Sequence, residues 1–206
     1  EAARAGRIRS LKGMGAKKEQ LILQAIEERQ RHAGRHILAR AAETADGIVT
    51  YLKLMAPEAE IITVGSVRRG QETSGDLDIL ASGADTSLAD AFTRFPMVER
   101  VLAHGGTKAS VLIRGGFQAD LRIVAPEQRG AALQYFTGSK AHNIALRDRA
   151  LARGLRLNEY SLTRLEDNAV LGGATEEEIY EALDLAWVPP ELREGRGEIE
   201  AAARRA

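Results

Sequence analysis

Apolar residues recur along the chain at two spacings, one typical of helices and one typical of strands. The helical spacing predicts helices over residues 35–56, 88–95, 128–135 and 140–153, and a last helix from Thr175 to Val188. Shorter β-branched or alternating stretches predict strands over residues 61–64, 76–80, 109–114 and 117–124, and a small hairpin within residues 155–173. This mixture of helices and short strands is typical of the α+β class.

A β-hairpin is predicted where two of these strands meet, because Gly115-Gly116 is a hairpin turn signal. Along the second strand of the hairpin, apolar residues alternate with polar ones. Asp120 falls on the polar side, between Ala119 and Leu121, which are expected to be buried. Taken alone, Asp120 is explained equally well as a surface residue of a half-exposed strand.

Formal charges balance over the 206-residue chain, since 29 Lys and Arg face 29 Asp and Glu. They are unevenly placed: residues 1–40 hold ten Lys or Arg against four Asp or Glu, and residues 136–163 hold five basic residues against two acidic ones. A neutral protein can therefore still present two basic surfaces to a polyanion, and the alternative is that these basic helices serve solubility alone. The acidic residues gather after Glu166, and the charged tail is expected to be poorly ordered beyond Arg196.

Composition excludes several other classes of protein. The chain has no Cys, so disulfides and Cys-based zinc sites are absent, and no apolar run approaches the length that crosses a membrane. The four histidines show no metal-ligand spacing, and His142 is expected on the surface of a helix. The chain begins at Glu1 rather than Met, so it is expected to be a fragment of a longer protein.

The N-terminal residues carry a pattern suited to DNA phosphates. Residues 8–15 place two glycines, Gly13 and Gly15, around one apolar residue, and Lys17 follows in an apolar helical series. This pattern resembles a helix-hairpin-helix motif, in which backbone N–H groups of the glycine corner contact a DNA phosphate without reading the bases. The alternative is an ordinary turn between two helices.

A phosphate site is predicted at the corner that follows the strand of residues 61–64. Gly65-Ser66 makes a tight turn, and the next residues open a short helix. Free backbone N–H groups at such a corner can accept phosphates, and Arg69 is close enough in sequence to neutralise them.

A metal site is predicted directly after this corner. Gly75 breaks the chain before a strand in which Asp76 and Asp78 project from the same face. Two adjacent carboxylates repel each other unless a cation lies between them, and Mg²⁺ prefers a few carboxylate oxygens together with substrate phosphates. Each fragment alone has a plainer explanation, since Gly-Ser is a common turn and Asp-x-Asp is usually a solvated strand edge.

In combination, these residues resemble the nucleotidyltransferase superfamily, whose pattern is Gly-Ser, a short spacer and Gly-Asp-x-Asp. The Arg68-Arg69-Gly70 insert narrows the resemblance to the family X DNA polymerases, the DNA polymerase beta type. Residues 133–160 are a second match, to the palm-to-thumb region of that family, and are closest to its bacterial and archaeal branch. Together with the strand of Asp120, the two blocks cover most of residues 60–185.

The resemblance implies a nucleotidyltransferase palm with a small mixed sheet and flanking helices, a helical N-terminal piece and a small α/β thumb. It divides the chain into the end of the fingers (residues 1–34), the palm (35–135) and the thumb (136–206). It implies a DNA-directed DNA polymerase that fills short gaps during repair with two Mg²⁺ ions, or Mn²⁺ in their place. Its partners would be gapped or primed DNA and deoxynucleoside triphosphates, and the protein would be a cytoplasmic, nucleoid-associated monomer with no membrane contact.

The resemblance also implies a role for individual residues. The metals and the chemistry would be held by three carboxylates, Asp76, Asp78 and Asp120. The nucleotide would contact Gly65, Ser66, Arg69, Gly75, Tyr135, Phe136, Gly138 and Asn143. DNA would contact Gly13, Gly15, Lys17, Arg147 and Tyr160. Arg122 would exchange partners between a metal-site aspartate and Glu159 as the thumb closes.

This chain departs from the family pattern at two places. The family has an arginine two residues before the third aspartate, where this chain has Gln118, and the N-terminal lyase domain is not in the sequence. Two other functions are compatible with part of this pattern, a template-independent nucleotidyltransferase and a non-catalytic DNA-binding scaffold. The residues from Tyr135 to Gly138, Arg147 and the helix-hairpin-helix pattern argue against the first, and the presence of all three carboxylates argues against the second.

Overall fold

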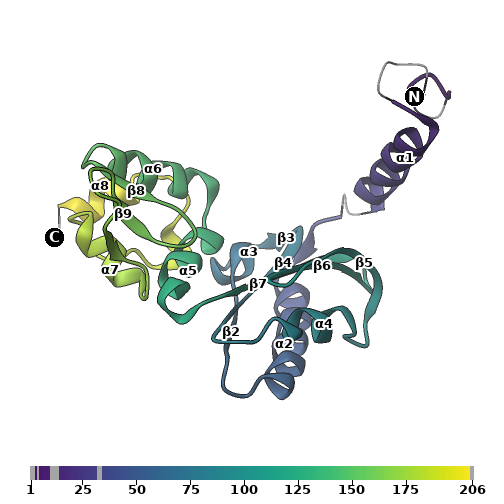
Figure 1. Ribbon diagram of the computed structural model, residues 1–206, viewed down its shortest axis with the longest axis horizontal. Coiled ribbons are helices and arrows are strands. Elements are labelled where there is room, and N and C mark those ends of the chain that lie inside the picture. Colours follow the sequence, from purple (N-terminus) through teal and green to yellow (C-terminus); the bar gives the residue numbers. More distant parts are fainter. Residues whose placement is uncertain (1–2, 4, 10–13, 32–33, 205–206) are drawn as a thin grey trace. The chain divides into compact units, whose positions relative to one another are not determined.

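A computed structural model describes residues 3, 5–9, 14–31 and 34–204, and its contacts divide the chain into two units, Glu1–Arg35 and His36–Ala206 (Figure 1). The first unit contains helix α1 (Ala16–Arg31). Glu19, near the start of α1, accepts hydrogen bonds at 3.0 Å from the backbone N–H groups of Ile8 and Arg9. Gly13, predicted to contact DNA, lies outside the described residues, so the helix-hairpin-helix stays a prediction.

A five-stranded sheet forms the centre of the second unit, in the order β2-β4-β7-β6-β5. Its strands are β2 (Glu60–Thr63), β4 (Asp76–Ser82), β5 (Val98–His104), β6 (Lys108–Ile113) and β7 (Phe117–Val124). β4 and β7 pair in parallel, and the other neighbours are antiparallel. The predicted α+β class with a small mixed sheet is therefore confirmed.

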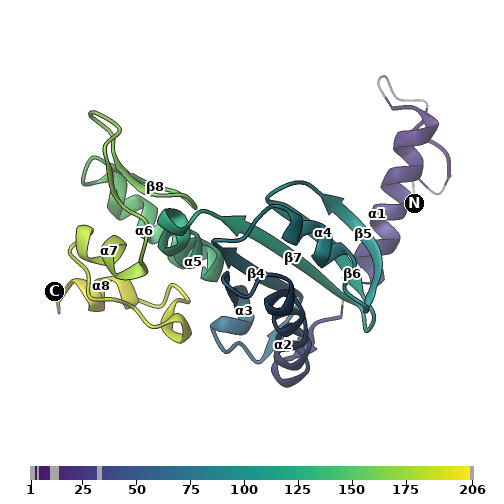
Figure 2. The same ribbon diagram turned by 60° about the horizontal axis from the view of Figure 1, so that its bottom comes forward.

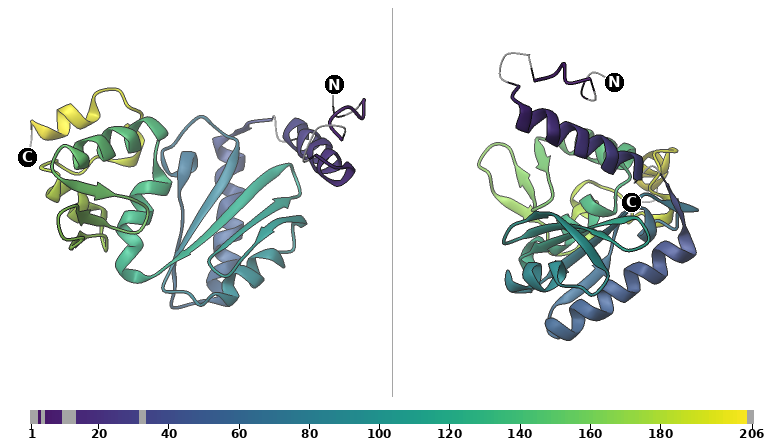
Figure 3. Two further views of the ribbon diagram at one scale, coloured as in Figure 1. Left: turned by 45° about the horizontal axis from the view of Figure 1, so that its top comes forward. Right: turned by 90° about the vertical axis from the view of Figure 1, so that its right-hand side faces the viewer.

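One face of this sheet is covered by helices α2 (Leu38–Met55) and α4 (Ser87–Thr93), which lie next to each other in Figure 1. Figure 3, left, shows α2 running behind the sheet. The core between them contains fully buried side chains from both layers, among them Ile48, Leu52, Leu77, Phe92 and Leu121. Since successive strand residues point to opposite faces, the residues next to Leu77 and Leu121 point away from this core.

Short elements join the sheet to the rest of the second unit. Helix α3 (Gly65–Arg68) follows β2, and the two-residue strands β1 (His36–Ile37) and β3 (Thr73–Ser74) pair antiparallel just before β4. The backbone leading into β4 is therefore fixed on one side by β1, which precedes α2. The predicted short helix at the Gly-Ser corner is present and begins at Gly65 itself.

The C-terminal subdomain, residues 129–204, packs helices around a small three-stranded sheet (Figure 2). Its helices are α5 (Arg129–Thr137), α6 (Lys140–Leu151), α7 (Glu176–Ala182) and α8 (Glu198–Ala203), with 3₁₀ turns η1 (Pro126–Gln128) just before it and η2 (Pro190–Leu192) within it. Its strands are β8 (Leu155–Leu157), β9 (Leu162–Arg164) and β10 (Val170–Gly172). None of the helices in the described ranges is both long and apolar enough to cross a membrane.

The structure corrects two expectations from the sequence and adds strands to the predicted set. The strand β5 was not predicted. Residues 155–173 contain the predicted hairpin, formed by β9 and β10 with Asp167 and Asn168 between them, and β8 adds a third strand beside β9. Among the described residues, the tail beyond Arg196 forms a packed helix, because α8 buries Ile199 and Ala202 in the core of the C-terminal subdomain. His142 is not on the surface; its side chain is fully buried between α6, α7 and α8.

Candidate active site

Three carboxylates lie on the sheet face that α2 and α4 leave uncovered. β4 carries Asp76 and Asp78, and β7 carries Asp120, which is the direct register partner of Asp78. The alternation of the two strands explains this placement, because Leu77 and Leu121 point into the core on the other face. The structure therefore brings together the three residues that the sequence assigns to chemistry; we call this surface the carboxylate face.

The negative charges of the carboxylate face act on one another. The pKa of Asp78 is raised to about 7, mainly by burial and then by the charges of Asp76 and Asp120, while Arg122 and Arg69 act in the opposite direction. Among the described residues, no three His, Cys, Asp or Glu side chains are already close enough together to enclose a metal ion. The donor set nevertheless suits Mg²⁺ or Mn²⁺, because it consists of carboxylates whose mutual repulsion a cation would relieve.

Asp120 is fixed by two neighbours that sequence reasoning did not assign. The Ser110 hydroxyl donates to Asp120 Oδ1, and Gln118 Nε2 donates to Asp120 Oδ2 at 2.9 Å. Ser110 is the register partner of Asp120 on β6. The alternation of polar and apolar residues over Lys108, Ala109 and Ser110 is the sequence signal that could have identified Ser110 as a neighbour of Asp120. Gln118 thus orients the third carboxylate in this chain.

A cavity of about 210 Å³ opens beside these groups. It is lined by Val64, Asp78, Ile79, Lys108, Ser110, Gln118, Asp120, Arg122 and Phe136. Lys108 is exposed at its edge, while Arg122 lies 5.3 Å from the centre of the Phe136 ring. The cavity therefore combines two carboxylates with two cationic side chains and an aromatic wall.

The corner between β2 and α3 closes against Asp78. Gly65 has a φ of +64°, and a Cβ there would lie 2.3 Å from Asp78 Oδ2. Only glycine allows the backbone to approach the carboxylate this closely. Ser66 Oγ lies 2.8 Å from Ser74 Oγ, and Ser74 in turn donates to the Asp76 carbonyl at 2.5 Å. Ser66 and Asp76 are thereby linked through β3, next to Gly75.

Both arginines that follow this corner contact the C-terminal subdomain. Arg68 pairs with Glu176, with Nη1 and Nη2 at 3.1 and 2.9 Å from its carboxylate oxygens. Arg69 Nε donates to Glu194 Oε1, and its Nη1 donates to the Thr137 carbonyl, each at 2.6 Å. Neither Glu176 nor Glu194 was assigned from the sequence, because they follow α3 by more than 100 residues.

The predicted nucleotide contacts of the C-terminal subdomain meet at the junction of α5 and α6. Asn143 Nδ2 donates to the Tyr135 carbonyl at 2.7 Å, and Asn143 Oδ1 accepts from Gln134 at 2.8 Å. Gly138 ends α5 with a φ of +60°, and a Cβ there would lie 3.7 Å from both Arg69 Nη1 and Asn143 Nδ2. The structure therefore brings Gly138 and Asn143 beside Arg69.

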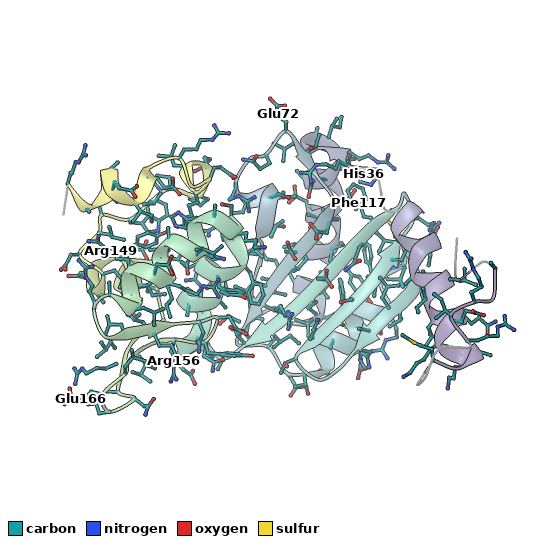
Figure 4. All side chains as sticks on the ribbon, turned by 90° about the horizontal axis from the view of Figure 1, so that it is seen from above. His36, Glu72, Phe117, Arg149, Arg156 and Glu166 are labelled. Carbon is teal, nitrogen blue, oxygen red and sulfur yellow. The ribbon has the colours of Figure 1, made fainter. Side chains whose placement is uncertain are left out.

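The structure does not bring the remaining predicted contacts, those of Arg147, Tyr160 and Glu159, together at one place. Arg147 is exposed, and its Nε donates to the Asn143 carbonyl of the same helix at 3.3 Å, while Tyr160 is 49% exposed. In the described part of the chain, Arg122 makes no hydrogen bond to Glu159. Figure 4 shows His36 beside Phe117, and their rings stack with centroids 3.8 Å apart, so that the first residue of β7 is fixed by β1.

The mixed sheet with its carboxylate face, followed by the C-terminal subdomain, defines a nucleotidyltransferase palm and thumb. The family model described as DNA polymerase beta palm matches residues 39–120, and the one described as DNA polymerase beta thumb matches residues 132–194. The chain belongs to the family X DNA polymerases, of the DNA polymerase beta type.

One relative agrees with this assignment, and two solved structures share the fold. The DNA polymerase/3'-5' exonuclease PolX of Bacillus subtilis (strain 168) is 34% identical over 203 residues, which cover 97% of this chain but only 36% of the relative's length. Crystal structures of Leishmania infantum polymerase beta, a ternary P/T complex and a ternary gap complex, share the fold with a TM-score of 0.73. Their sequences are 21% and 19% identical to this chain. Each match covers 82% of this chain, together with 80% of the polymerase chain in the first structure and 74% in the second.

Proposed function

We propose that the protein is a DNA-directed DNA polymerase that adds deoxynucleotides to primer 3′ ends in short gaps during DNA repair. The observation that carries this proposal is the register pairing of Asp78 with Asp120 beside Asp76, which gathers three carboxylates on one open sheet face. The PolX relative and the ternary complexes of polymerase beta support DNA as the partner.

In this proposal, the primer 3′ oxygen attacks the α-phosphorus of the incoming nucleotide. A new P–O bond forms, the bond to pyrophosphate breaks, and the hydroxyl proton passes to Asp120, which Ser110 and Gln118 hold in place. Asp76, Asp78 and Asp120 would hold two Mg²⁺ or Mn²⁺ ions. When bound, these ions lower the pKa of the attacking hydroxyl and neutralise the triphosphate and the leaving pyrophosphate.

The nucleotide would lie between the palm corner and the α5–α6 junction. Gly65, Ser66, Arg69 and Gly75 would bind the β- and γ-phosphates. Tyr135, Phe136 and Gly138 would pack along the sugar, and Asn143 would reach the minor-groove edge of the base. The close approach of Gly138 to Arg69 supports one continuous nucleotide site.

DNA would be bound by residues outside this pocket. Gly13, Gly15 and Lys17 would contact phosphates, while Arg147 and Tyr160 would lie against the template strand. Arg122 would exchange a metal-site aspartate for Glu159 as the thumb closes. That the protein is a cytoplasmic, nucleoid-associated monomer stays a prediction.

Extension of a primer across a one-nucleotide gap, by a full-length protein with labelled deoxynucleotides and Mg²⁺ or Mn²⁺, tests the proposal. Wild type should extend the primer by the templated base, and Asp120→Ala should abolish extension. Asp90→Asn, an exposed acid on α4, is the matched control and should retain activity. Absence of extension by wild type would contradict the polymerase proposal. Full activity of Glu159→Ala would contradict the proposed exchange of Arg122 between a metal-site aspartate and Glu159.

A further inference from the structure

The arginine proposed to bind the triphosphate is already ion-paired within the protein. Glu194 holds its Nε at 2.6 Å, and the Thr137 carbonyl holds its Nη1. Among the described residues, Nη2 of Arg69 makes no hydrogen bond. A phosphate that approaches Arg69 therefore meets a guanidinium whose Nε is occupied by a carboxylate. Because carboxylates and phosphates use the same fork of N–H donors, the two groups compete.

The neighbouring ion pair shows why Glu194 in particular can be displaced. Glu176 accepts hydrogen bonds from Arg68, from Arg193 at 2.5 Å and from the Trp187 indole at 3.4 Å, and its side chain is 3% exposed. Burial acts to raise the pKa of Glu176, but the hydrogen bonds from Arg68 and Arg193 outweigh it and hold the pKa below its ordinary value. Glu176 is therefore locked in place.

Glu194 is held much more loosely than Glu176. Its carboxylate pairs with Arg69 alone among the described residues, and its side chain is 20% exposed. Part of the Glu194 side chain therefore already faces solvent. Displacement of Glu194 thus requires no loss of a buried network.

The backbone around Glu194 is fixed, so displacement is confined to the side chain. The Glu194 N–H donates to the Leu192 carbonyl at 2.9 Å, and the next residue, Gly195, donates to Glu198 at 2.8 Å. On the other side, Arg193 is fully buried and its Nε donates to the Val188 carbonyl at 2.9 Å. The fixed backbone therefore holds Glu194 next to Arg69, and only the Glu194 side chain is left to move.

We propose that Glu194 is a resident competitor of the nucleotide polyphosphate for Arg69, and that it sets the affinity for the incoming nucleotide. This inference rests on the proposed function. A triphosphate displaces Glu194 because it offers Arg69 more negative charge and also reaches the Gly65-Ser66 corner. A diphosphate that displaces Glu194 meets the same cost, and one that does not displace it binds without Arg69.

The test is nucleotide binding by the full-length protein on gapped DNA with a dideoxy-terminated primer, which prevents incorporation. Glu194→Gln should lower the Kd for the matching deoxynucleoside triphosphate about three- to fivefold, the effect of one partly exposed ion pair. It should lower the Kd for the matching diphosphate by at most the same factor, because the cost of displacing Glu194 is all that the substitution can return. The matched control is Glu191→Gln, which removes an exposed charge from the same segment and should leave both constants unchanged.

A double variant identifies the partner. In an Arg69→Gln background, Glu194→Gln should have no effect on either Kd. Unchanged or weaker triphosphate binding by Glu194→Gln alone would overturn the inference, since Glu194 would then orient Arg69 or be neutral. A wild-type protein that neither binds nor incorporates nucleotide would remove the proposed function and this inference together.

Discussion

Gly65 is the residue at which backbone conformation and site chemistry are most closely connected. Its φ of +64° is one that side chains disfavour, and a Cβ there would collide with Asp78 Oδ2. Gly70 has almost the same φ, +66°, but a Cβ there would meet nothing closer than 4.0 Å. The two glycines therefore separate the effect of backbone strain from the effect of displacing a carboxylate.

Gly65→Ala should reduce nucleotide incorporation about 100-fold, because misplacement of a reacting group by about 1 Å has an effect of this order. Gly70→Ala should retain most of the activity, since it introduces a similar strain without the collision. Gap filling under steady-state conditions measures both, and circular dichroism verifies that both variants fold. Equal losses in the two variants would show that strain alone is responsible.

At the scale of elements, the sequence predicts those strands and helices whose apolar residues repeat regularly. The alternation along β7 buries Phe117, Ala119 and Leu121 and so places Asp120 on the open face, as predicted. β5 was not predicted because its apolar residues do not alternate with polar ones, and none of the residues of this edge strand is buried. The tail helix α8 offers only Ile199 and Ala202 among charged neighbours, which is too few for a period.

Some residues of the candidate site could likewise be predicted from the sequence, and others could not. Asp76, Asp78 and Asp120 follow from strand periodicity and resemblance, since each requires only local structure. The partners of Arg68 and Arg69 do not, because Glu176 and Glu194 reach them through tertiary packing across more than 100 residues. His142 is intermediate: it lies four residues before Leu146 and eight before Ala150 on the buried stripe of α6, which sequence periodicity could have revealed.

His142 connects three elements of the C-terminal subdomain. From α6 it hydrogen-bonds Glu198 of α8 through Nδ1 and the Tyr180 hydroxyl of α7 through Nε2, each at 2.7 Å. Burial lowers the pKa of His142 below its ordinary value of 6.5, and Arg193 adds to this effect, while Glu198 and Glu176 oppose it. The folded protein thus binds this proton more weakly than the unfolded chain does.

The sign of the pH dependence follows. The stabilisation is complete above pH 6.5 and is lost as the pH falls below 6.5 toward the lowered pKa. Wild type should lose unfolding free energy between about pH 7.5 and about pH 5.5, and His142→Gln should lose less over the same interval. Thermal melts at the two pH values measure this, and the exposed His104, changed to Gln, should keep the wild-type dependence.

At the scale of the whole molecule, equal numbers of basic and acidic residues conceal an uneven distribution of charge. The N-terminal unit carries a basic excess, and Lys17 is exposed in the first turn of α1. Affinity for DNA therefore depends on the placement of cations, and each phosphate contact has a measurable salt dependence.

Lys17→Gln should lower the slope of log Kd against log salt concentration by about 0.9, the contribution of one phosphate contact on duplex DNA. Fluorescence anisotropy with gapped DNA at several salt concentrations measures the slope. Lys53→Gln, at the exposed end of α2, removes the same charge from the palm and should leave the slope unchanged. A similar change in both variants would mean that the N-terminal unit makes no specific phosphate contact.

The parallel pairing of β4 with β7 also implies an order in which we expect the strands to pair. The β6–β7 hairpin and the β2–β4 pair close short loops and can form early, whereas Asp78 and Asp120 meet only after a loop of about 40 residues has closed. Repulsion among the carboxylates consequently opposes only the later pairing of β4 with β7. It does not affect the formation of the β6–β7 hairpin or of the β2–β4 pair. A divalent cation present during refolding should accelerate that last phase alone.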